Sequence, residues 1–206
     1  CKYNGMKLKL GLIGRDQTIQ PIDIGRWNNG INLMIMAHIL IFVVYTAATS
    51  TGLFEVQVGE LTIGDYVQRY LTLTGGEDQT LAGWVSGIAA YQFIHINPWE
   101  LLVSMSTLWF FGHILRSRLD EQKVLSLYLV TILVAAIAFV LSYYVFQVFT
   151  GRSTVMAGAF SGALGVATAA TFLYRTHRVR VGTRMIPLWK IYVWGVLLPT
   201  ALILKP

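Results

Sequence analysis

Charged side chains are scarce in this sequence, and their scarcity identifies the solvent in which the chain folds. Only 13% of the 206 residues are Asp, Glu, Lys or Arg, whereas 55% are hydrophobic. An ordinary soluble domain carries about 25% charged residues. A chain of this composition suits a lipid bilayer, where a helix of roughly 20 mostly apolar residues satisfies its own backbone hydrogen bonds. We therefore predict an all-α integral membrane protein, built as a polytopic helical bundle.

Cysteine and metal-binding patterns are also lacking. Cys1 is the only cysteine, which excludes an intramolecular disulfide. The apolar segments contain no His-x-x-x-His pattern and no cluster of carboxylates. His38, His95 and His113 lie in or near these segments, but their spacing matches no known ligand pattern. We expect no metal site and no cofactor.

Five apolar segments are long enough to be membrane spans. They cover residues 31–49, 100–115, 124–149, 154–174 and 186–204. Residues 1–30 form a basic N-terminal segment, and residues 31–206 form one membrane domain. Between the first two spans, residues 50–98 form a long acidic loop that we expect to dip into the membrane interface. Within this loop we predict a short amphipathic helix over residues 62–73 and a turn over residues 74–76.

Lysine and arginine are distributed unevenly between the two sides of these spans. Five lie in the N-terminal segment, three follow the second span, and five surround the loop after the fourth span. The opposite side holds only Arg69, Arg152 and Lys205. The positive-inside bias therefore predicts a cytoplasmic N-terminus and an outer location for the loop 50–98. The net charge of +6 follows from this topology, so nucleic acid is not an expected partner.

Small residues gather in the fourth predicted span, around a single serine. Ser161 is flanked by Gly158, Gly162 and Gly165 within an uncharged stretch. Small residues allow close helix packing in lipid, where a serine hydroxyl can bond to its own helix or to a neighbour. The same pattern can also carry a serine nucleophile inside the membrane. The residues by themselves favour packing and leave both interpretations open.

Two stretches of this chain resemble the rhomboid superfamily of intramembrane serine proteases. In that family a histidine, a second histidine followed by leucine, and an Asn-Met pair lead into a Leu-Trp-x-Phe-Gly-like segment. The matching residues here are His95, Leu101, Met105, Leu108, Trp109, Phe111 and Gly112. The family's Gly-x-Ser-Gly-like nucleophile motif corresponds to residues 159–162, with Ser161 at the position of the nucleophile. With the predicted topology, the resemblance extends over residues 31–204.

The sequence departs from the family pattern at the positions that bind the oxyanion. Glu100 stands at the second histidine and Ser104 at the asparagine. In active relatives these side chains stabilise the tetrahedral oxyanion, and one such donor contributes roughly 2.7–4 kcal/mol. A carboxylate at Glu100 would instead repel the developing charge. The family's glycine two residues before the serine is Ala159, although Gly158 is adjacent.

The resemblance also implies a catalytic histidine in a sixth span, and no histidine follows His177. Either a sixth span continues beyond Pro206, or the protein is a rhomboid without a catalytic dyad. We expect a catalytically inactive member of the family, in which Ser161 is a vestigial nucleophile. The oxyanion site would be occupied by His95, Glu100 and Ser104. Close packing of the helices would use Gly112, Gly158, Gly162 and Gly165.

Three functions remain open at this stage. The first is a pseudoprotease that binds transmembrane helices of client proteins in the bilayer without cleaving them. The second is an active intramembrane serine endopeptidase that uses Ser161 and a histidine in an unseen sixth span. The third is a structural subunit of a larger membrane complex.

Overall fold

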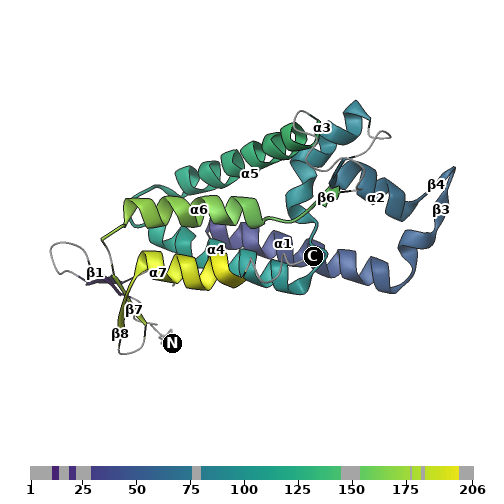
Figure 1. The fold of residues 1–206 in the computed structure, drawn as a ribbon. Helices are drawn as coiled ribbons and strands as arrows, with labels where there is room; N and C mark the ends of the chain where they lie inside the picture. Colours follow the sequence, from purple (N-terminus) through teal and green to yellow (C-terminus); the bar gives the residue numbers. More distant parts are fainter. Residues whose placement is uncertain are drawn as a thin grey trace. The chain divides into compact units, whose positions relative to one another are not determined.

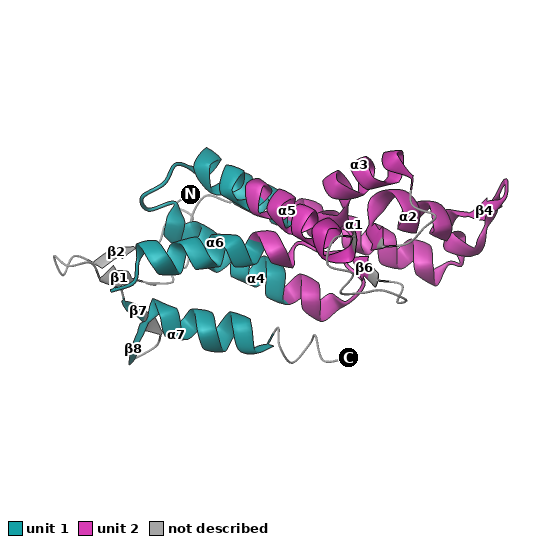
Figure 2. Ribbon diagram, turned by 45° about the horizontal axis from the view of Figure 1, so that its top comes forward, with its two compact units in different colours: residues 1–35, 103–128, 163–206 teal, residues 36–102, 129–162 magenta. Residues whose placement is uncertain are grey.

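A computed structural model describes residues 11–13, 19–21, 29–75, 80–144, 154–176, 178–181 and 184–199. Two compact units are distinguished within the chain, and their residues are coloured separately in Figure 2. Unit 1 comprises residues 1–35, 103–128 and 163–206, and unit 2 comprises residues 36–102 and 129–162. Each unit is described by itself below.

Helices dominate the described residues (Figure 1). The α-helices are α1 (Gly30–Ser50), α2 (Ile63–Leu71), α3 (Leu81–Ala90), α4 (Pro98–Leu115), α5 (Glu121–Tyr144), α6 (Phe160–Leu173) and α7 (Leu188–Tyr192). Two short 3₁₀ turns, η1 (Leu53–Glu55) and η2 (Tyr91–Phe93), and a π-helical turn, η3 (Val193–Leu197), complete the helical elements. Helices therefore occupy part of every predicted span.

Among the described residues, two helices are long and apolar enough to cross a bilayer. They are Gly30–Ser50, with a mean hydropathy of 2.1, and Glu121–Tyr143, with a mean hydropathy of 2.8. Both expose large hydrophobic side chains, among them Leu40 on α1 and Val134 on α5. Such faces suit contact with lipid, because lipid tails are as apolar as the side chains themselves. Residues 160–173 and 188–197 form shorter apolar helices, so the count of five spans stays a prediction.

Unit 1 combines helix packing with a small sheet. Its buried apolar residues include Leu108, Phe111, Ile114 and Leu188. The sheet has the strand order β2-β1-β7-β8, with β1 at Gly11–Ile13, β2 at Ile19–Pro21, β7 at Arg178–Val181 and β8 at Arg184–Pro187. All its neighbouring strands are antiparallel, and Leu12 pairs with Val179. The sheet thus joins β1, from the N-terminal segment, to β7, which follows α6.

The short connection between α4 and α5 is also held within unit 1. Arg116 forms an ion pair with Glu121 at 3.3 Å, and Glu121 also accepts a hydrogen bond from the backbone N–H of Gly30. Ser117 and Tyr174 share a hydrogen bond of 2.6 Å between their hydroxyls. These contacts join the ends of four helices, α1, α4, α5 and α6, within unit 1.

Unit 2 contains the loop 50–98, which is more structured than its sequence suggested. Its hairpin pairs β3 (Gln57–Val58) with β4 (Leu61–Thr62) and leads directly into α2. Thr62 and Asp65 form a capping box at the start of α2, where each side chain bonds the backbone N–H of the other residue. This cap explains why the amphipathic helix begins close to its predicted start.

Two predicted boundaries were wrong, both because of one pair of strands. The turn predicted at residues 74–76 is instead part of β5 (Leu73–Gly75), with Gly76 outside the described residues. The first residues of the predicted span 154–174 form β6 (Thr154–Met156), which pairs antiparallel with β5. Local sequence gave no sign of this pairing, because its partners lie about 80 residues apart in the chain.

Candidate functional site

The chain that enters α6 is held by the backbone and side chains of residues 91–95, all within unit 2. The backbone N–H of Gly158 donates to the carbonyl oxygen of Tyr91 at 2.8 Å. The next N–H, that of Ala159, donates to Nε2 of His95 at 3.2 Å. Gly158, Ala159, Tyr91 and His95 are all buried. This pair of hydrogen bonds sets the position at which α6 begins, at Phe160, one residue before Ser161.

His95 is consequently a neutral imidazole with a defined tautomer. Because Nε2 accepts from Ala159, the ring proton lies on Nδ1, which faces the carbonyl oxygen of Phe93 at 3.4 Å. Burial, assisted by the neighbouring His38, lowers the pKa of His95 to about 4. The rings of His38 and His95 meet edge to face with centroids 5.6 Å apart. Both nitrogens of His95 are therefore occupied by backbone groups.

The Ser161 hydroxyl lies beside a tyrosine. The Tyr91 hydroxyl is 2.8 Å from the carbonyl oxygen of Ile132 and 3.2 Å from Oγ of Ser161. A carbonyl oxygen only accepts, so Tyr91 donates to Ile132 and receives the proton of Ser161. Burial raises the pKa of Tyr91, which keeps the phenol protonated at neutral pH. A protonated phenol does not remove a proton from serine, so this contact orients Ser161 without activating it.

Glu100 lies against Gly158 at the entrance to α6. Gly158 has a φ of +94°, a backbone conformation that side-chain-bearing residues rarely adopt. A Cβ atom built on Gly158 would collide with Oε1 of Glu100, so the glycine also makes room for the carboxylate. Glu100 is half-buried in the first turn of α4. The Glu100 carboxyl group therefore lies against Gly158, which is three residues before Ser161 and close to the start of α6.

Ser104 and Gly112 belong to unit 1 and are described separately. Ser104 is fully buried, and its Oγ has no hydrogen-bond partner among the described residues. It follows Glu100 by four residues on α4, a spacing that places two side chains on the same face of a helix. A Cβ atom on Gly112 would lie 3.1 Å from Cδ1 of Ile31, so α1 and α4 approach closely there.

The remaining glycines of the motif lie on α6. Gly162 is buried, and Gly165 is partly buried. Within the described residues no group of three His, Cys, Asp or Glu side chains is placed to hold a metal ion.

The comparison with protein families decides how these residues are to be interpreted. The Rhomboid domain model matches residues 82–206, which is more than half of the chain. The chain belongs to the rhomboid family. No curated protein and no solved structure matches it. Together with the apolar helices α1 and α5, family membership makes this an integral membrane protein.

In this rhomboid, the structure brings together three of the four principal residues singled out from the sequence. His95, Glu100 and Ser161 all belong to unit 2, where His95 and Glu100 contact the two residues that precede α6. Sequence reasoning missed Tyr91, the residue that contacts Ser161. Its position four residues before His95 was the only available signal, and a tyrosine in an aromatic stretch is too common to single out.

Proposed function

We propose that this rhomboid-family protein is a pseudoprotease that binds transmembrane segments of partner proteins without cleaving them. The observation that carries this proposal is the hydrogen bond between Ser161 and Tyr91. A serine nucleophile needs an adjacent base, and the phenol of Tyr91 already donates its own proton to Ile132. Within the described residues no histidine is hydrogen-bonded to Ser161.

The charge beside the serine motif supports the same conclusion. A serine protease stabilises the oxyanion of its intermediate with hydrogen-bond donors. Glu100, which stands where the family has a donor histidine, can only accept when ionised, and it approaches Gly158 at the start of α6. Helix N-termini attract anions, so the carboxylate would occupy the electrostatically favourable place that an oxyanion needs.

Retention of the fold without the chemistry would leave a surface suited to other helices. A helix in lipid can be bound through exposed apolar side chains, and Trp99 on α4 exposes 64% of its surface. Exposed apolar residues on α4, such as Leu102 with 55% of its surface exposed, provide further contact area. A client's transmembrane helix is the partner with the matching chemistry.

A serine-directed fluorophosphonate probe tests the inactive state. We expect no labelling of Ser161 in the folded, membrane-reconstituted protein, with an active serine hydrolase in the same vesicles as the positive control. Labelling that disappears in Ser161→Ala would overturn the proposal in favour of an intramembrane protease.

Site-specific photocrosslinking tests client binding. A photoreactive amino acid at Trp99 or Leu102, both exposed on α4, should capture a discrete membrane protein, whereas the similarly exposed Val134 on α5 should not. The crosslinks should persist in a Ser161→Ala background, because binding does not use the hydroxyl. Equal crosslinking from all three positions, or loss of the adduct in Ser161→Ala, would contradict binding at this surface.

A further inference from the structure

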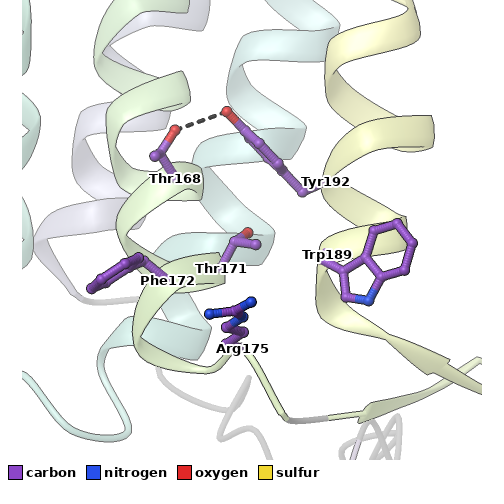
Figure 3. A pocket seen from close by; sticks show the side chains of 6 residues that line it. All are labelled: Thr168, Thr171, Phe172, Arg175, Trp189 and Tyr192. Atoms are coloured by element: carbon purple, nitrogen blue, oxygen red, sulfur yellow. Dashed lines mark hydrogen bonds between the residues drawn. The ribbon is translucent and has the colours of Figure 1, made fainter.

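Unit 1 contains a pocket between α6 and the α7–η3 helix (Figure 3). Its volume is about 410 Å³, which falls within the range of about 300–1,000 Å³ for small-molecule sites. The lining residues are Thr168, Thr171, Phe172, Arg175, Trp189 and Tyr192. The residues of the Ser161 motif are not among them, so this pocket is a separate feature of the protein.

The walls of the pocket are preformed and leave few polar groups facing it. Thr168 donates to the carbonyl oxygen of Leu164, so the Tyr192 hydroxyl donates to Thr168 across the 2.8 Å between them. The Tyr192 ring also packs edge to face on Phe111, with centroids 6.1 Å apart. Thr171 likewise donates to its own helix, at the carbonyl oxygen of Ala167. The threonine donors are used, and the walls present mainly methyl groups and aromatic carbon.

Arg175 supplies the charge of the pocket. It lies just beyond the end of α6, and Figure 3 shows its side chain below Thr171 at the end of this helix. Arg175 is exposed and makes no ion pair with any described residue, whereas Arg116 and Lys123 pair with acidic neighbours. Lys190 does not line the pocket, but its Nζ lies 5.6 Å from the centre of the ring of Trp189, which does.

We propose that this pocket binds a phospholipid with an anionic headgroup. A guanidinium group forms paired, charge-assisted hydrogen bonds with phosphate oxygens, so Arg175 would hold the headgroup. Phe172, with 78% of its surface exposed, and Trp189, with 45% exposed, offer apolar contact that an acyl chain fills and a soluble anion does not.

The location of the pocket supports a lipid rather than another anion. Arg175 belongs to the group of basic residues predicted to face the cytoplasm, where the leaflet is rich in anionic lipid. Basic pockets between membrane helices on that side are recognised sites for such headgroups. The proposal does not depend on whether Ser161 is active, because its residues and its test are separate.

The test is a lipid titration of the full chain in detergent, followed by native mass spectrometry. The probes are phosphatidylglycerol and phosphatidylcholine with identical acyl chains. Arg175→Gln should weaken phosphatidylglycerol binding at least fivefold. Arg178→Gln, which removes the same charge from β7 outside the pocket lining, should weaken it less than twofold. Phosphatidylcholine binding should be weaker in the wild type and unchanged in both variants.

Three results would overturn the proposal. Equal losses in Arg175→Gln and Arg178→Gln would indicate diffuse attraction to a basic surface. Equal binding of the two lipids would show that the pocket does not recognise the headgroup. Inorganic phosphate that binds through Arg175 without being displaced by phosphatidylglycerol would identify a soluble anion site. Trp189→Ala should weaken the lipid without affecting phosphate, and thermal unfolding of each variant verifies that it is folded.

Discussion

Replacing Tyr91 with phenylalanine is the most direct perturbation of the site. The substitution keeps the buried ring and removes only the hydroxyl, which bonds to Ile132 at 2.8 Å and to Ser161 at 3.2 Å. Tyr91 has no solvent exposure, so water does not replace the lost partners without a local opening. The variant therefore isolates the hydroxyl from the packing of the ring.

The expected cost follows from the two hydrogen bonds. Each buried hydrogen bond contributes about 1 kcal/mol net, and a buried group left without its partner costs about 1–3 kcal/mol. The carbonyl of Ile132 lies within α5 and keeps its helical acceptor role, so most of the loss comes from the two hydroxyls. We expect Tyr91→Phe to lower the free energy of unfolding by about 1–3 kcal/mol.

Thermal and denaturant unfolding in detergent, followed by tryptophan fluorescence, measures this change. Tyr45→Phe is the matched control, because Tyr45 packs on Phe54 in the same unit and its hydroxyl has no described hydrogen bond. It should cost less than about 0.5 kcal/mol, the usual range for changes that break no contact. In a double-mutant cycle, Tyr91→Phe and Ser161→Ala should be coupled by about 0.5–1.5 kcal/mol. Additive effects, or equal costs for Tyr91→Phe and Tyr45→Phe, would refute the Ser161–Tyr91 hydrogen bond.

Two further predictions concern the neighbouring residues. Gly158→Ala should destabilise the protein by about 1 kcal/mol more than Gly59→Ala. Both glycines have a positive φ, but only Gly158 contacts the Glu100 carboxylate. A Glu100→Ala background should abolish the difference, and equal costs in the parent protein would contradict the contact. The free energy of unfolding should fall by up to about 3 kcal/mol as the pH drops from 6.5 to 4. In this range His95 becomes protonated in the unfolded chain, whereas in the folded chain it stays neutral because its pKa is lowered to about 4. His95→Gln should flatten this profile measured in detergent, and parallel profiles would exclude His95 as its cause.

Much of the helical framework could be predicted from the sequence. The apolar segments 31–49 and 100–115, which were predicted to be helical, agree closely with the bounds of α1 at Gly30–Ser50 and α4 at Pro98–Leu115. A long apolar run that satisfies its own hydrogen bonds leaves little alternative to a helix. The start of α2 was predictable for a similar local reason, because Thr62 and Asp65 are a capping pair three residues apart.

The strands and the roles of the site residues could not be predicted in this way. β1 and β7 are separated by more than 160 residues, and each is too short to be distinguished from a loop. His95 was expected at the oxyanion site by resemblance, but its Nε2 is engaged by the N–H of Ala159. That bond depends on the close approach of two segments 64 residues apart, which composition and spacing do not specify.

The sequence by itself determined the solvent, the helices and the family, because hydropathy, local capping and motif spacing are properties of neighbouring residues. Only the tertiary structure decided what Ser161 contacts. Its partner Tyr91 is 70 residues away, and the chain must fold before the phenol reaches the serine. The same is true of Glu100, whose carboxylate contacts a glycine that no helix pattern connects to it. Interactions between neighbouring residues select the helices, whereas the environment of each polar side chain depends on which distant segment packs beside it.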